Sequence, residues 1–221
     1  MTSSPSLFPR SQGTDPLGGP PIFNLPNQIT IARLILSVVF FVLLALFDQV
    51  YGPFKIPFPP LPAGGLALLD VAIGVFILTA ATDFLDGYLA RKWGMVSAFG
   101  RIADPFVDKV FICGSFIFLI AISPLVQPWL VVVIIMREFL VSGLRSFLES
   151  RGIPFGAALG GKMKMVVQSI TVPFVIFHRA HFPESEGMRY FVIGLLGLTL
   201  LLTVTSTAGY VRRAVASLRK R

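Results

Sequence analysis

Long apolar stretches alternate with short polar ones along most of the chain. An apolar α-helix of about 20 residues crosses the hydrocarbon core of a bilayer. Stretches that approach this length lie at residues 29–47, 66–85, 106–122, 129–148, 165–178 and 190–210. The fifth is short and contains Pro173, which a spanning helix tolerates where its neighbours satisfy the freed carbonyl. The pattern therefore predicts an all-α integral membrane protein with six transmembrane helices.

The composition agrees with a membrane protein, because 54% of the 221 residues are hydrophobic and only 14% are charged. The net charge is +8, but the positions of the basic residues favour a membrane surface and anionic ligands over nucleic acid. We therefore expect no nucleic-acid partner. The single cysteine, Cys113, lies in an apolar run and is expected to be a small buried hydrophobe.

The basic residues predict the orientation in the membrane. They are frequent in the polar segments after the second, fourth and sixth stretches, whereas the opposite side holds only Lys55, Arg179 and Arg189. The positive-inside rule then places both termini in the cytoplasm of a multi-pass protein of the cell (inner) membrane. We expect residues 1–27 to be a flexible cytoplasmic tail, 28–211 a six-helix transmembrane domain and 212–221 a basic cytoplasmic tail.

Four aspartates interrupt the apolar pattern between the second and third stretches, at positions 83, 86, 104 and 108. An unpaired aspartate at the centre of a spanning helix costs roughly 2.5–3.5 kcal/mol on translocon scales, so these carboxylates require a cationic partner. With helical spacing, Asp83 shares a stripe with Gly87 and Ala90, while residues 100, 104 and 108 share one face of the next helix. The short connection makes the two helices antiparallel neighbours, which brings both acidic faces together near the cytoplasmic surface.

This donor set favours a hard cation. Four oxygen ligands with no cysteine or histidine nearby suit Mg²⁺ or Mn²⁺ better than Zn²⁺ or copper. Four carboxylates also suit two ions better than one.

The residues in this region spell DxxDGxxAR, eight intervening residues, and GxxxDxxxD. The pattern resembles the signature of the CDP-alcohol phosphotransferases, which are integral membrane enzymes that make phospholipids. The resemblance implies a six-helix fold, usually a homodimer, with a cytoplasm-facing cavity that holds two divalent cations, Mg²⁺ or Mn²⁺. All the fixed positions of the signature are present, as Asp83, Asp86, Gly87, Ala90, Arg91, Gly100, Asp104 and Asp108.

The resemblance also implies roles for these residues. All four aspartates are expected to bind metal, and Asp108 is also the expected general base toward the acceptor hydroxyl. The residues expected to bind the CDP moiety are Gly87, Ala90, Arg91, Gly100, Asn27 and Thr30.

Basic residues of the fourth stretch are candidates for binding the acceptor. Arg137 and Arg145 are eight residues apart and lie on roughly the same side of a helix, and Lys162 and Lys164 follow near the same membrane surface. Arginine grips phosphate oxygens in pairs. We therefore expect Arg137, Arg145 and Lys162 to bind an acceptor that is itself a phosphate ester.

Further stretches are similar to those of phosphatidylglycerophosphate synthases, at residues 24–33, 104–109, 137–145 and 161–164. The chain departs at Met165, where that subfamily commonly has threonine. The similarity implies transfer of the phosphatidyl group from CDP-diacylglycerol to sn-glycerol 3-phosphate, which yields phosphatidylglycerophosphate and CMP.

Alternatives remain open at this point. The acceptor could be phosphatidylglycerol, as in a cardiolipin synthase, or inositol phosphate, or serine. A divalent-cation transporter would also place acids within the membrane. Among single residues, Arg33 and Lys109 could simply snorkel to the interface. Lys164 and the C-terminal basic run could only set the topology or meet anionic lipid. His178 and His181 are expected in a solvated outer loop.

Overall fold

The computed structural model describes residues 25–51, 61–93, 98–153 and 159–219, and these form six α-helices without a β-strand. For residues 25–27, 83–93, 98–104, 159–160 and 218 it describes the backbone alone. The helices are α1 (Leu25–Tyr51), α2 (Ala63–Trp93), α3 (Ala98–Ile122), α4 (Pro128–Ser150), α5 (Leu159–His181) and α6 (Glu186–Arg219). Each predicted apolar stretch lies within one of them, so the all-α prediction is confirmed.

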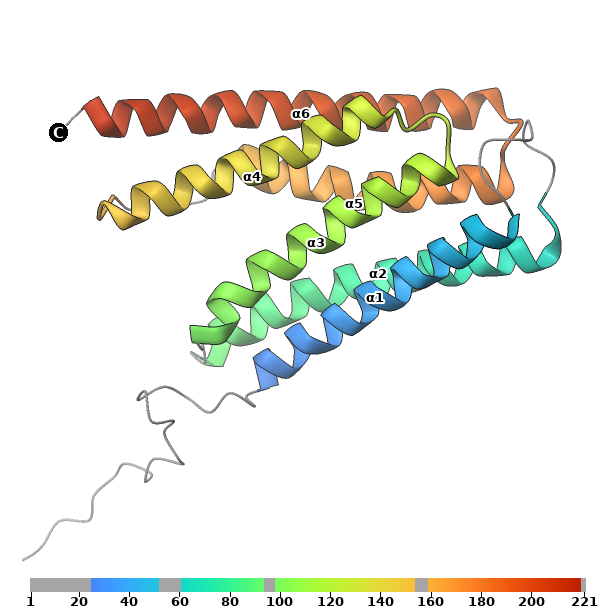
Figure 1. Cartoon of the computed structure of the whole chain (residues 1–221), viewed down its shortest axis with the longest axis horizontal. Helices are drawn as coiled ribbons and strands as arrows, with labels where there is room; N and C mark the ends of the chain where they lie inside the picture. The colour runs from blue at the N-terminus through green and yellow to red at the C-terminus, as the bar shows by residue number, and fades with distance from the viewer. Residues whose placement is uncertain (1–24, 52–60, 94–97, 154–158, 220–221) are drawn as a thin grey trace, which may run out of the picture.

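Successive helices run in opposite directions, so each helix ends on the side of the bundle where the next one begins. The beginnings of α1, α3 and α5 and the ends of α2, α4 and α6 point to the same end of the bundle, on the left of Figure 1. α1 packs against α2 and α3, and α4 packs against α6. The two groups are connected by α5, which contacts α2, α3 and α6, and by a contact between α3 and α4. The end of α2 and the beginning of α3, which carry the aspartate signature, therefore share one end of the molecule.

Three phenylalanines hold the first group of helices together. The rings of Phe40, Phe76 and Phe111 are buried where α1, α2 and α3 meet. Their centroids are 5.4 Å apart for Phe40–Phe76, 5.7 Å for Phe40–Phe111 and 4.8 Å for Phe76–Phe111. Each aromatic pair adds about 0.5–1.5 kcal/mol beyond the burial of its surface. This cluster sets the packing of the helices on which the signature lies.

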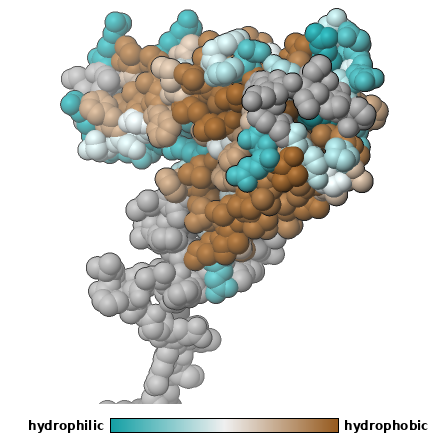
Figure 2. All heavy atoms as spheres, turned by 45° about the vertical axis from the view of Figure 1, so that its right-hand side comes forward, coloured by the Kyte–Doolittle hydropathy of each residue, from teal (hydrophilic) through white to brown (hydrophobic). Residues whose placement is uncertain are grey.

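Much of the outer surface of the helices is apolar. Figure 2 shows hydrophobic residues, in brown, covering wide areas of the visible sides of the helices. The segments Gln28–Tyr51, Ala63–Thr82, Pro105–Ile122 and Glu186–Ser217 are long and apolar enough to cross a membrane. The protein is thus a multi-pass membrane protein with four such helices among the described residues. α4 and α5 are more polar because they carry charged and amide side chains that face a pocket.

The prediction that His178 and His181 lie in a solvated loop is wrong. α5 continues to His181, and His178 is only 2% exposed. His181 lies in the last turn, where its Nε2 is 2.7 Å from Oδ1 of Asp70 on α2. The polar residues of this end extend the helix instead of ending it, because they find positions against neighbouring helices.

Candidate functional site

A cavity of about 290 Å³ lies between α3, α4, α5 and α6, near the end of the bundle where the signature is found. Its walls come from residues 105–112 of α3, 137–145 of α4, 161–168 of α5 and Tyr210 of α6. We call it the basic pocket, because cationic side chains outnumber acidic ones in its lining. Its charged and amide residues are Asp108, Lys109, Arg137, Glu138, Arg145, Lys162, Lys164 and Gln168.

Glu138 binds two cations of the basic pocket. Its Oε1 accepts a hydrogen bond from Nζ of Lys164, and it lies 3.2 Å from Nη1 of Arg137. Lys164 is only 1% exposed and reaches Glu138 from α5. The simple alternative, in which Lys164 only sets the topology or meets lipid, is therefore wrong. A buried ammonium needs a counter-charge, and Glu138 supplies it.

Arg137 is also held from α6. Its Nη2 donates to Oγ of Ser206 at 3.2 Å, and its guanidinium carbon lies 5.5 Å from the centre of the Tyr210 ring. The guanidinium carbon of Arg213 lies 4.8 Å from the same ring. A cation over an aromatic face is stabilised by about 0.5–2 kcal/mol. α6 thus forms a polar and aromatic wall that fixes the direction of Arg137.

Asp108 is the signature aspartate whose side chain the structure describes. It lines the basic pocket, and its carboxylate accepts a hydrogen bond from Nη1 of Arg33 on α1. Arg33 is 1% exposed, so it does not snorkel to the interface, and that alternative is wrong. The ion pair joins α1 to α3 and directs one carboxylate of the signature toward the cations of α4 and α5.

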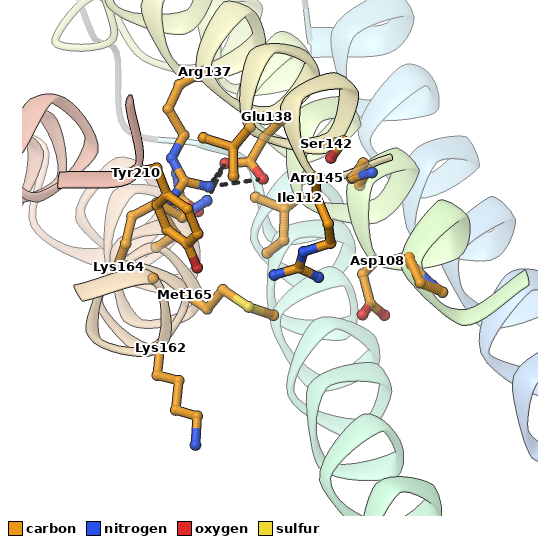
Figure 3. A pocket seen from close by; sticks show the side chains of 15 residues that line it. Asp108, Ile112, Arg137, Glu138, Ser142, Arg145, Lys162, Lys164, Met165 and Tyr210 are labelled. Carbon is orange, nitrogen blue, oxygen red and sulfur yellow. Dashed lines mark hydrogen bonds and ion pairs between the residues drawn. The ribbon is translucent and has the colours of Figure 1, made fainter. Parts of the chain in front are cut away.

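The predicted acceptor-binding residues all line this pocket, but their side chains differ in burial and direction. Arg145 is half-buried and extends into the space between Glu138 and Asp108 in Figure 3. Lys162 is exposed and points away from the other labelled side chains. Lys109 also lines the pocket, next to Asp108. Snorkelling to the membrane interface alone would not require this position.

The remaining signature residues are described only as helical backbone. The positions of Asp83, Asp86, Gly87, Ala90 and Arg91 lie in the last turns of α2, and those of Gly100 and Asp104 in the first turns of α3. Their side chains, and that of Asn27 on α1, lie outside the described residues. Thr30 is described and buried, one turn before Arg33 on α1.

The metal site is therefore not tested by geometry. Among the side chains that are described, no three His, Cys, Asp or Glu residues gather around a common point. Asp108 is the one predicted ligand in that set.

Sequence reasoning missed Glu138, Gln168 and Tyr210 as members of this site. Glu138 carried a usable signal, since an acid within an apolar stretch needs a partner in the membrane. Gln168 gave a weaker signal of the same kind, as an amide within the fifth apolar stretch. Tyr210 carried none, because tyrosine is common at the ends of membrane helices.

Comparison with known proteins places these features in a family. Residues 23–207 match the family described as CDP-alcohol phosphatidyltransferase. The CDP-diacylglycerol–glycerol-3-phosphate 3-phosphatidyltransferase of Bacillus subtilis (strain 168) is 38% identical over 162 residues, which cover 73% of this chain and 80% of that protein. A probable phosphatidylglycerophosphate synthase of Mycobacterium tuberculosis (strain H37Rv) is 36% identical over 197 residues, covering 88% of this chain and 83% of the relative. The match spans most of the six-helix chain and both halves of the signature, and the chain therefore belongs to the CDP-alcohol phosphatidyltransferase family.

Proposed function

We propose that this protein transfers the phosphatidyl group of CDP-diacylglycerol to sn-glycerol 3-phosphate, producing phosphatidylglycerophosphate and CMP. The observation that carries the proposal is the basic pocket, which opens beside Asp108 of the signature. The names of the relatives in Bacillus subtilis and Mycobacterium tuberculosis support the same reaction.

The charge of the pocket favours a phosphate ester as acceptor. The cations from α3, α4 and α5 outnumber the carboxylates of Asp108 and Glu138 that line the same space. A phosphate monoester carries close to two negative charges at neutral pH and offers several acceptor oxygens, which arginine binds in pairs. A volume of about 290 Å³ suits a small molecule better than a second phospholipid.

The aspartates of the signature fit two divalent cations by the chemistry of their donors. Carboxylate oxygens are the ligands that Mg²⁺ and Mn²⁺ prefer, and Asp83, Asp86, Asp104 and Asp108 would hold them. When bound, such ions supply positive charge that stabilises the diphosphate as CMP leaves. Next to them, the residues that would bind the CDP moiety are Gly87, Ala90, Arg91, Gly100, Asn27 and Thr30.

The chain's own residues would then orient the acceptor and remove its proton. The phosphate end is held by Arg137, Arg145 and Lys162, with Lys164 beside them, so that a hydroxyl points toward Asp108. This hydroxyl attacks the phosphorus that bears the diacylglycerol, and Asp108 accepts its proton as the new bond forms. Arg33 holds the Asp108 carboxylate from α1 and so keeps it in position.

The test is turnover by the purified protein with CDP-diacylglycerol, sn-glycerol 3-phosphate and Mg²⁺. We expect release of CMP and formation of phosphatidylglycerophosphate, measured by mass spectrometry. Asp108→Asn should lower turnover by about 100-fold or more, because loss of a general base typically costs that much. Release of CMP with phosphatidylglycerol, inositol phosphate or serine but not with glycerol 3-phosphate would contradict the proposed acceptor.

The proposal extends to the membrane arrangement. α4 and α5 have 23 residues each, which is about 35 Å of helix and enough to cross the bilayer core. Six spans place both termini on one side, and the basic residues favour the cytoplasmic side of the inner membrane. Residues 28–211 would then be the transmembrane catalytic domain, with residues 1–27 and 212–221 on its cytoplasmic side. We also propose a homodimer, as the family resemblance implies.

A further inference from the structure

Gln168 is a buried amide without a partner. Its relative exposure is 0%, and neither its Nε2 nor its Oε1 makes a hydrogen bond among the described residues. Arg137 and Arg145, which line the same pocket, each leave a buried Nε without a hydrogen bond among the described residues. On the same helix as Gln168, in contrast, the Thr171 hydroxyl donates to the carbonyl of Val167 at 2.8 Å and lies 2.9 Å from the Thr199 hydroxyl. Buried polar side chains are nearly always hydrogen-bonded, so an orphan amide requires an explanation.

A hydrogen-bonding partner for the Gln168 amide could come from the basic pocket. Gln168 lines the basic pocket, and it lies one helical turn after Lys164 on the same face of α5. Ile112 of α3 and Val141 of α4 line the same cavity and offer no polar side-chain atoms to the amide. The lipid around a spanning helix offers the amide no hydrogen bond, so its partner has to enter through the pocket. A ligand in the pocket can therefore satisfy this amide.

The chemistry of an amide differs from that of the surrounding cations. Arginine and lysine only donate hydrogen bonds, which suits phosphate oxygens, whereas the amide both donates and accepts. A hydroxyl group also donates and accepts, so it is the natural complement of Gln168. The pocket thus combines cations for a phosphate with one neutral group for a hydroxyl.

From this arrangement we infer that Gln168 is a specificity-determining residue, whose amide hydrogen-bonds a non-reacting hydroxyl of a polyol monophosphate acceptor. The inference rests on the proposed function and refines it. Glycerol 3-phosphate has a terminal hydroxyl, which reacts, and a C2 hydroxyl, which stays free. Gln168 recognises the C2 hydroxyl and thereby selects this acceptor over phosphate esters that lack it.

The experiment compares two acceptors with the purified, full-length protein in the presence of CDP-diacylglycerol and Mg²⁺. One is sn-glycerol 3-phosphate, and the other is 3-hydroxypropyl phosphate, which differs only by the missing C2 hydroxyl. The wild type should prefer glycerol 3-phosphate by about 10- to 100-fold in kcat/KM, because a buried group left unpaired penalises the analogue. Gln168→Met, which keeps the size but not the hydrogen bonds, should lose that preference while the KM for CDP-diacylglycerol stays the same.

A matched control separates recognition from stability. Thr171→Val also removes a buried polar group of α5, but Thr171 does not line the pocket, so the preference between the two acceptors should remain. If Gln168→Met does not fold, Gln168→Asn keeps an amide that is one methylene too short, and the same loss of preference is expected.

The outcomes are distinct. Equal use of both acceptors by the wild type, or an unchanged preference in the Gln168 variant, would overturn the inference while leaving the proposed function intact. No CMP release with either acceptor, together with release for an acceptor without a phosphate monoester, would overturn the proposed function and this inference with it.

Discussion

Glu138 places one carboxylate between two buried cations in the interior of the helix bundle. Lys164 and Arg137 approach it from different helices, and both are almost inaccessible to solvent. Such an ion pair is a weak source of stability as a whole, but the loss of one partner leaves a buried charge uncompensated. The Glu138 carboxylate therefore keeps both Lys164 and Arg137 in place among apolar side chains.

Glu138→Gln should destabilise the protein by about 3–5 kcal/mol, because it removes the counter-charge of a buried ammonium. Unfolding of the purified protein in detergent, followed by circular dichroism, measures the effect. The matched control is Glu186→Gln, whose partner Arg189 is exposed at the surface, and it should change stability by less than about 1 kcal/mol.

A double variant separates stability from activity. Glu138→Gln combined with Lys164→Met removes both charges, so stability should return toward that of the wild type while turnover with glycerol 3-phosphate stays low. Wild-type stability of Glu138→Gln alone would show that Lys164 does not depend on this carboxylate.

The helices α1 and α3 approach closely at one glycine. A methyl group added at Gly114 would lie 2.5 Å from Cζ of Phe41, and the Phe41 ring is stacked on Phe118 at 5.5 Å. The ring cannot turn away without losing that contact. The same two helices carry the Arg33–Asp108 ion pair, so the spacing between them affects both stability and the proposed general base.

Gly114→Ala should therefore lower both the Tm and the turnover, because α1 and α3 must separate. Gly74→Ala is the matched control, since Gly74 lies in α2 with no atom within 4 Å of an added methyl group. In the control, alanine should stabilise the helix by about 0.5–1 kcal/mol. A Tm for Gly114→Ala at or above that of the control would contradict the close approach.

At the scale of the whole molecule, the six antiparallel helices bring the signature, the basic pocket and the chain's C-terminal helix end to one end of the bundle. A soluble phosphate ester must reach this end from water, whereas the diacylglycerol must stay in the bilayer. The basic residues favour the cytoplasmic side for it.

Single-cysteine labelling tests this orientation in intact cells. Glu184→Cys lies between α5 and α6 and should react with a membrane-impermeant thiol reagent added outside, whereas Arg219→Cys at the end of α6 should react only after the cells are opened. The native Cys113 is buried and makes the wild type a suitable background. The reverse labelling pattern would overturn the proposed topology.

The helices and the signature could be predicted because their information is local. Apolar length predicts a membrane helix, and the i, i+4 spacing of Asp104 and Asp108 places them on one face whatever the helix packs against. The same reasoning failed at His178, where polar residues at the end of an apolar stretch resembled a loop. Their burial against other helices kept them helical.

The sequence by itself determined six helices, an acidic signature at one end of the second and third, and hence the family and its chemistry. Only the tertiary structure decided which charges meet. The partner of Arg33 is 75 residues away and that of Lys164 is 26 residues away, so neither pair follows from helical spacing. These pairs, and the orphan amide of Gln168 beside them, depend on how α1, α3, α4 and α5 pack. A helix with several apolar faces can pack through any of them, and the hydrophobic pattern of the sequence does not determine which face is used.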